Sequence, residues 1–125
     1  MPVMNVLKPI SLVTAGSLGA NLTSRAINTQ FLNEAYLQLV FTGTPTGTFV
    51  VETSGDYVPD DEFRTSPPNA GTWDALDLGT TLSASGAAGS ISVDITLSAV
   101  PWLRVRYTRS SGTGTLNAKI SGKTT

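Results

Sequence analysis

The chain has 125 residues and a mass of 13.0 kDa, which is the size of one ordinary domain. It contains no cysteine and no histidine, which excludes disulfides, thiolate or imidazole metal sites and histidine bases. Eight Lys and Arg against nine Asp and Glu give a net charge of -1, so no global field draws the protein to nucleic acid or to an anionic membrane.

Small neutral residues supply the polar surface, because only 14% of the residues are charged. There are 18 Thr, 13 Ser and 12 Gly, and the polar residues that favour helices are scarce. Thr fits a pleated surface, and Gly and Ser supply turns, so this composition predicts an all-β protein. The longest apolar stretches fall far short of the roughly 18 residues that a membrane span requires.

Residues 1–20 form a segment whose apolar stretches are short. Its apolar residues are interrupted by Asn5, Pro9, Thr14, Gly16 and Gly19, and it has a single Lys. A secretory signal is not expected, since both a basic start and an unbroken apolar run are missing. We expect an N-terminal arm or an edge strand over 1–20 and a single β-sandwich domain over 21–125.

The first half of that domain shows short strands separated by turn residues. Residues 9–14 and 22–28 are short strand candidates. Residues 36–42 and 48–53 flank a Gly-Thr-Pro-Thr-Gly turn, which predicts a β-hairpin. Residues 55–71 then form a long loop rich in Pro and Asp, and loops of this length in compact domains usually carry function.

The second half is more regular. Residues 73–78 are predicted as a short strand, and residues 83–89 as a flexible connection. In residues 91–98 aliphatic and polar residues alternate without a fault, which is typical of a half-buried antiparallel strand. Alternation returns in 102–108 and 115–121, and the Gly-containing turn 109–114 between them predicts a second hairpin.

About eight short strands at intervals of 8 to 14 residues indicate an antiparallel β-sandwich. Both a jelly-roll and an immunoglobulin-like arrangement fit this spacing, and periodicity leaves the strand order open.

Acidic residues concentrate in the long loop, where Asp56, Asp60, Asp61 and Glu62 lie within seven positions. Hard oxygen ligands in a loop can coordinate Ca²⁺, but this spacing matches no calcium loop and Pro59 stiffens its middle. We therefore expect a solvated acidic loop and no metal site, with a cation site as the alternative.

The strand 102–109 carries Trp102, Arg104 and Arg106 on one face. Such side chains can stack on bases or sugars and bind phosphates, but outward faces of sandwiches also carry Arg for solubility. Because the net charge is slightly negative, we expect no nucleic-acid partner.

Charge is segregated along the chain. Residues 52–77 hold seven of the nine acids against Arg64 alone, whereas residues 102–125 hold five bases and no acid. Either the two regions pair within one subunit, or an acidic patch on one copy meets a basic patch on the next. The candidate interface residues are Trp102, Arg104, Arg106, Arg109, Asp60, Asp61 and Glu62.

Catalysis is not expected. Ser and Thr are plentiful, but no His is present to activate one of them as a nucleophile. No glycine-rich nucleotide-binding motif occurs, so we expect no cofactor. The sequence thus predicts a protein that is not an enzyme and has no catalytic or cofactor-binding residues.

The C-terminal part of the chain resembles small virion proteins of tailed bacteriophages. The resemblance covers about residues 34–123 and depends on packing and turn motifs. These are a tryptophan strand at 72–76, a Trp-x-Arg-x-x-Tyr-Thr strand at 102–108, a Ser-Gly-x-Gly turn at 111–114 and the closing Ile-Ser-Gly-Lys at 120–123. No active residue is carried over by these motifs.

The resemblance implies a β-sandwich subunit of the virion, foremost a head decoration (cement) protein that binds the major capsid protein or other virion proteins. It further implies a symmetric homo-oligomer, with a trimer as the first expectation. Residues 1–18 lie outside the resemblance, and because this segment is apolar yet interrupted by Gly we expect it to form an arm that contacts a neighbouring subunit or the capsid. A tail or fibre component is one alternative. A small carbohydrate-binding module is another, with Tyr57, Trp73, Trp102 and Tyr107 as its candidate residues.

Overall fold

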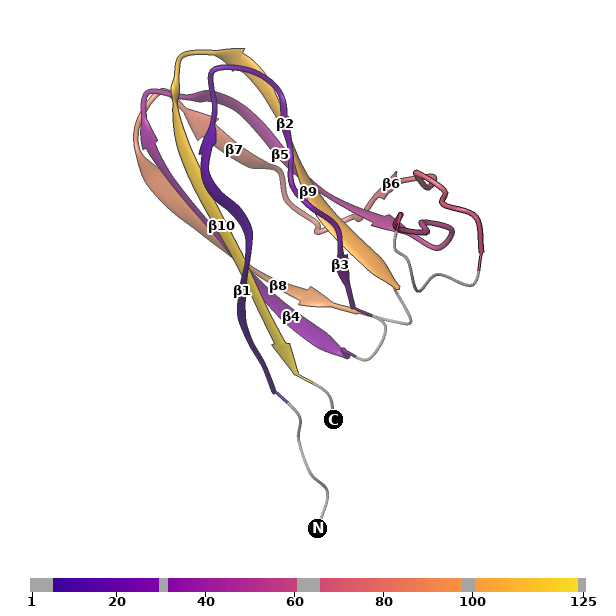
Figure 1. Ribbon diagram of the computed structural model, residues 1–125. Coiled ribbons are helices and arrows are strands. Elements are labelled where there is room, and N and C mark those ends of the chain that lie inside the picture. The colour runs from indigo at the N-terminus through magenta and orange to yellow at the C-terminus, as the bar shows by residue number, and fades with distance from the viewer. Residues whose placement is uncertain (1–5, 30–31, 61–65, 98–100, 124–125) are drawn as a thin grey trace.

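The structure, a computed structural model, describes residues 6–29, 32–60, 66–97 and 101–123. These residues form strands and loops, which confirms the all-β prediction (Figure 1). No helix long and apolar enough to cross a membrane occurs among them. The strands are β1 Val6–Ser17, β2 Leu22–Thr23, β3 Ile27–Asn28, β4 Glu34–Gly43, β5 Thr46–Ser54, β6 Asp74–Ala75, β7 Leu82–Ser85, β8 Gly89–Thr96, β9 Trp102–Ser111 and β10 Gly114–Lys123.

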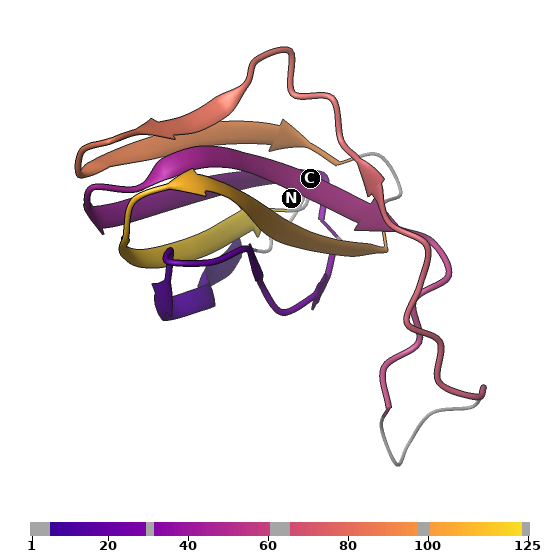
Figure 2. The same ribbon diagram turned by 90° about the horizontal axis from the view of Figure 1, so that it is seen from above.

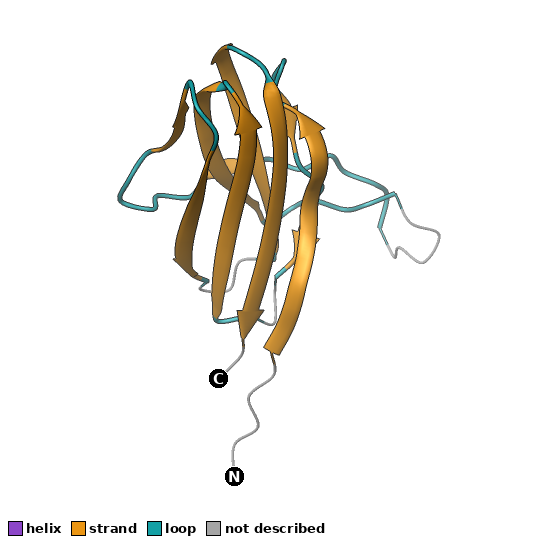
Figure 3. Ribbon diagram, turned by 90° about the vertical axis from the view of Figure 1, so that its left-hand side faces the viewer, coloured by secondary structure: helices purple, strands orange, loops and turns teal. Residues whose placement is uncertain are grey.

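The strands build two antiparallel sheets that pack face to face, so the predicted sandwich is confirmed (Figures 1 and 3). Sheet A has the order β1-β10-β4-β8. Sheet B has the order β2-β9-β5-β6, with β3 also paired to β9 and β7 also paired to β5. Because β2 and β3 share one partner, and β6 and β7 share another, each pair acts as one interrupted strand. Each sheet is therefore four strands wide.

The core lies between the sheets and is built by period-2 alternation. In β4 every second side chain is buried from Ala35 to Phe41, and in β9 the buried residues are Leu103, Val105 and Tyr107. Aromatic rings connect the two sheets. The ring centroid of Phe41 lies 5.6 Å from that of Phe49, and the ring centroid of Phe49 lies 4.9 Å from that of Tyr107. The faces predicted for residues 102–108 thus agree with the structure.

The two predicted hairpins are wrong. β4 and β5 lie in different sheets, as do β9 and β10, so each short turn is an arch that crosses the sandwich. The in-sheet hairpin lies elsewhere, because β5 pairs with β6 and β7 across the long loop 55–73. Alternation places apolar residues inward in a hairpin and in an arch alike, so the pattern does not tell which strands pair.

The two arches lie side by side at one end of the sandwich. Gly43 pairs with Gly114 in the register of β4 and β10, and the Thr44 N–H donates to the Thr113 carbonyl at 2.8 Å. Gly43 and Gly112 have φ of +84° and +78°, a region that glycine enters without steric cost. These turns allow the chain to cross between the sheets within two residues.

Two shorter elements also differ from the sequence prediction. Residues 83–89 are not a flexible connection, because Leu82 and Ala84 of β7 are buried beside β5. The strand expected at 73–78 is reduced to Asp74–Ala75, where Ala75 is exposed. The strand β7 is hard to predict from the sequence, because Ser and Ala differ little in hydrophobicity and so show only weak alternation.

The N-terminal segment forms an edge strand in its described part. β1 pairs with β10, and Leu12, Val13 and Leu18 belong to the core. Residues 6–18 therefore do not extend from the sandwich as an arm, and residues 1–5 lie outside the described residues. Burial of these three aliphatic side chains stabilises the docked strand more than a detached one.

Candidate interaction site at the long loop

The loop between β5 and β6 comprises residues 55–73, and its described parts, 55–60 and 66–73, project away from the sandwich (Figure 2). Asp56 connects the two ends of this loop. Its Oδ1 accepts hydrogen bonds from the Ser54 hydroxyl at 2.9 Å and from the Thr72 N–H at 2.6 Å. The bond from Thr72 first, and then that from Ser54, lowers the pKa of the Asp56 carboxyl below its ordinary value. Farther out, Val58 and Asn69 exchange backbone hydrogen bonds of 2.9 and 3.0 Å, so the two legs of the loop run as a pair.

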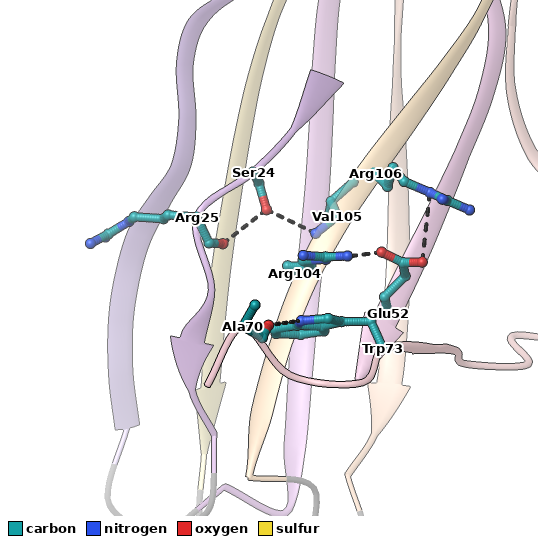
Figure 4. Close-up of polar contacts among 8 residues, drawn as sticks. All are labelled: Ser24, Arg25, Glu52, Ala70, Trp73, Arg104, Val105 and Arg106. Carbon is teal, nitrogen blue, oxygen red and sulfur yellow. Dashed lines mark hydrogen bonds and ion pairs between the residues drawn. The ribbon is translucent and has the colours of Figure 1, made fainter. Parts of the chain in front are cut away.

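Three aromatic side chains meet where this loop joins sheet B. The Tyr57 ring lies 4.8 Å from the Trp102 ring at 73°, an edge-on contact, and 5.5 Å from the Trp73 ring. The Trp73 indole N–H donates to the Ala70 carbonyl at 2.9 Å, which fixes the ring against the loop (Figure 4). All three rings are half-buried. The cluster thus anchors the loop and still presents aromatic surface to solvent.

An ion-pair group continues this cluster along the outer face of sheet B. Glu52 of β5 is 5% exposed, and its Oε1 accepts from Arg104 Nε at 2.9 Å (Figure 4). Its other oxygen lies 3.6 Å from Arg106 Nε. The Arg104 guanidinium also lies over the Trp73 ring, 4.2 Å from its centroid. We call Glu52, Tyr57, Trp73, Trp102 and Arg104 the aromatic–arginine cluster.

The structure brings some of the predicted site residues together and separates others. Trp102, Arg104 and Arg106 share the outer face of β9, as the alternation predicts. Arg109 lies near the far end of β9, where its Nε donates to the Gly112 carbonyl at 2.9 Å. Asp60 is exposed in the loop. Asp61 and Glu62 lie outside the described residues.

Some acidic and basic side chains of the described residues pair within one subunit. Glu52 forms ion pairs with Arg104 and Arg106. Glu34 of β4 pairs with Lys123 of β10, with 3.2 Å between Glu34 Oε2 and Lys123 Nζ. For these residues the first of the two alternatives, pairing within one chain, is the one observed. Among the described residues no group of three or more acidic side chains converges as a metal site would require.

Sequence reasoning missed the central role of Glu52. The signal was present, because period 2 places Glu52 on the face opposite Val51, and β9 offers two arginines on its outer face. What was lacking was the pairing of β5 with β9, which sets Glu52 directly opposite Arg104. A strand assignment without strand order does not reveal this contact.

Tyr107 is not a carbohydrate-binding candidate, because its side chain is 1% exposed and packs on Phe49 in the core. Its hydroxyl is buried and has no hydrogen-bond partner among the described residues. Burial raises the pKa of Tyr107, while nearby Arg109 opposes that rise. Tyr107 alternates with Trp102, Arg104 and Arg106, so its inward direction follows from the pattern.

A second surface lies on the outer face of sheet A. Tyr36 and Val40 of the central strand β4 are 42% and 39% exposed and point to the same side. A depression of about 480 Å³ beside Tyr36 is lined by Glu34, Asp94, Ser121 and Lys123, among others. This surface is shallow and mixed in polarity, which suits contact with another macromolecule more than capture of a small ligand.

Comparison with known proteins gives structural likeness without sequence likeness. No protein-family model matches the chain, and no curated protein matches it. The SPBc2 prophage-derived protein YomS is similar with a TM-score of 0.54 and 8% identity, over 98% of this chain and 97% of that one. A chain in the structure of infectious bursal disease virus, Gx strain, is similar with a TM-score of 0.53 and 10% identity. That match covers 97% of this chain and 32% of the viral one, so the chain spans about a third of that protein. At these identities the likeness establishes the fold: an all-β sandwich that a prophage protein and a virus also use.

Proposed function

We propose that this chain is a structural protein of a tailed-phage particle and serves as a head decoration (cement) protein that binds the capsid as a symmetric homo-oligomer. The strand order is the observation that carries the proposal. Orders β1-β10-β4-β8 and β2/β3-β9-β5-β6/β7, with one in-sheet hairpin, support an eight-stranded jelly roll. An immunoglobulin-like sandwich has three in-sheet connections and does not fit. Jelly rolls build many viral capsid domains.

Two further observations support a place in the virion. The structural neighbours are a prophage protein and a virus, and the likeness to the first extends over nearly the full length of both chains. The packing and turn motifs of residues 34–123 resemble phage virion proteins independently of the fold. A fold alone does not imply function, so the proposal depends on both lines together.

The proposal treats the chain as a binding protein without catalysis. The charged groups that the fold brings together in sheet B, Glu52 with Arg104 and Arg106, form ion pairs with one another. The major capsid protein is the proposed partner, and the projecting loop 55–73 with its aromatic–arginine cluster is the proposed contact.

A carbohydrate-binding function is the second candidate. Tyr57, Trp73 and Trp102 are half-buried aromatic side chains gathered at one loop, and such rings form stacking platforms for sugars. Jelly rolls also build lectin domains. In a phage particle this function belongs with a tail or fibre part that contacts the host surface.

Counting copies of the chain in purified particles tests the proposed function. Quantitative mass spectrometry should find it in a number comparable to that of the major capsid protein, as expected for a decoration protein. A few copies per particle would assign the chain to the tail or fibre instead. Absence from washed, infectious particles would overturn the virion role.

Fluorescence separates the carbohydrate candidate from the first. Binding of a host-surface glycan should change the emission of Trp73 and Trp102, and a Tyr57→Ala variant should weaken the effect by removing a ring of the platform. An emission spectrum that no host polysaccharide changes would leave the aromatic–arginine cluster as a protein-contacting surface.

A further inference from the structure

The sandwich has four sheet edges, and three of them are interrupted within the described residues. β1 contains Pro9, which has no N–H to donate, and its pairing with β10 shifts register at three places. The two edges of sheet B are broken: β2 and β3 are two residues each, and β6 and β7 are separated by residues 76–81. Bulges, prolines and short strands are the devices by which proteins prevent unwanted pairing at a sheet edge.

The fourth edge, β8, has none of these devices. It pairs with β4 from Gly89↔Phe41 to Thr96↔Glu34 without a register shift, over eight residues. It contains no proline and no lysine, and Asp94 is its single charge. Every second residue of an edge strand directs its N–H and carbonyl away from the sheet, so β8 offers a regular row of backbone groups that no other described strand pairs.

The inward side of β8 is also incompletely covered. Ile91 and Val93 point into the sandwich but are only half-buried. Leu39 and Leu37, which lie opposite them on β4, are 0% exposed. The difference arises because β8, among the described strands, has a neighbour on one side alone. A strand added beside β8 would cover this apolar flank and satisfy the backbone groups in one step.

We propose that β8 pairs with β8 of a second copy of this chain, antiparallel about a two-fold axis through Ser92, so that the two A sheets become one continuous sheet. In this register Ile91 faces Val93 of the second copy, and the apolar flanks cover each other. The outward residues face outward partners, as they must when the axis is perpendicular to the sheet.

The sequence of β8 is self-complementary in this register. Asp94 lies opposite Ser90 of the second copy, whose hydroxyl can donate to the carboxylate, and this contact occurs twice. A register two residues farther along places Asp94 opposite Ser92. Only a register centred on Asp94 itself brings like charges together. An isologous contact of this kind closes as a dimer, the commonest soluble assembly.

This pairing does not require the virion role, because it is a property of the purified chain. It produces an even-numbered assembly, which differs from the trimer that the resemblance implies. A chain that dimerises but is absent from particles would leave the pairing intact and overturn the proposed function. A chain that is abundant in particles but shows no pairing through β8 would do the reverse.

Charge variants at Ser90 test the pairing directly, because this position faces Asp94 of the second copy. Ser90→Lys creates two opposite-charge contacts and should tighten the dimer, and Ser90→Asp creates two like-charge contacts and should weaken it. Each dissociation constant, measured by sedimentation equilibrium, should change by about two- to thirty-fold in opposite directions. Ser90 is exposed, so both variants should keep the circular dichroism spectrum of the parent.

The matched controls are Gln38→Lys and Gln38→Asp, which make the same charges on the outer face one strand away from the edge. These variants should leave the dissociation constant unchanged within about two-fold, since their charges lie farther from the second copy. Hydrogen exchange of residues 89–96 should also slow as protein concentration rises. The proposal would be overturned by a chain that stays monomeric, or by a trimer whose dissociation constant is the same in both Ser90 variants. In either case hydrogen exchange in β8 would be independent of protein concentration.

Discussion

At the scale of single residues, Glu52 decides how the outer face of sheet B is organised. Its carboxylate is buried, and Arg104 and Arg106 approach its two oxygens from the neighbouring strand. Arg104 in turn covers Trp73, which holds the loop. One buried acid therefore connects the sheet, through one arginine, to the projecting loop.

Replacement of Glu52 by Gln should lower the free energy of unfolding by about 1–3 kcal/mol, because two arginines lose their countercharge beside a buried position. Urea unfolding followed by tryptophan fluorescence measures this change. The control is Glu34→Gln, which breaks the exposed pair with Lys123 and should change the free energy by less than about 0.5 kcal/mol. Equal effects of the two variants would contradict the role given to Glu52.

Tyr107 makes a separate prediction, because its buried hydroxyl has no partner. Tyr107→Phe removes an unsatisfied polar group and should raise the free energy of unfolding by about 1 kcal/mol. The exposed Tyr36→Phe is the matched control and should have no effect on stability. A loss of stability in Tyr107→Phe would show that the hydroxyl has a partner that stabilises the fold.

The raised pKa of Tyr107 adds a pH dependence to the same pair of variants. The folded protein keeps the phenolic proton at pH values where the unfolded chain loses it. Stability is thus full below the ordinary tyrosine pKa of about 10 and falls as pH rises through the folded pKa. Tyr107→Phe should lose less stability in this alkaline range than Tyr36→Phe.

At the scale of elements, the sequence predicts which side of each strand faces the core but not which strands pair. The alternation predicted the correct faces in 91–97 and 102–108, since burial of every second residue is a local property, and residue 98 lies outside the described residues. The turns 43–47 and 109–114 misled, because a glycine-rich turn serves a hairpin and an arch equally. The aromatic–arginine cluster depends on the pairing of β5 with β9, so its residues could be nominated from the sequence but not assembled.

The arch between β9 and β10 tests this interpretation of the turns. A Cβ on Gly112 would collide with the Thr44 carbonyl of the neighbouring arch, and the positive φ adds strain. Gly112→Ala should therefore lower the free energy of unfolding by about 2 kcal/mol. Gly55→Ala is the control, because nothing lies within 4 Å of its Cβ position, and its effect should stay within about 1 kcal/mol. A neutral Gly112→Ala would mean that the two arches do not lie side by side.

At the scale of the whole molecule, the wrapping of the chain between two sheets dominates its folding. Apart from the β5 to β6 connection and the interrupted strands, each strand is followed by one in the opposite sheet. The two termini of the described chain meet through the pairing of β1 with β10. Few contacts are local, so the entropy cost of closing long loops comes before strand pairing can stabilise the fold.

Refolding should accordingly be slow for a chain of this size, in the range of milliseconds to seconds. Stopped-flow dilution from urea with tryptophan fluorescence measures the rate. A control comes from Gly55→Ala, which alters the long loop without touching an arch and should refold at the parental rate. Refolding within microseconds would be incompatible with a fold dominated by pairing between distant segments.

The proposed role concerns where this β-sandwich sits in a phage particle, and electron cryo-microscopy of intact particles tests it most directly. The account predicts density for a pair of four-stranded sheets with one projecting loop, repeated at symmetry-related positions on the outside of the head. The loop should lie against a neighbouring protein. A head map that accounts for every exterior density without this sandwich would contradict the central claim.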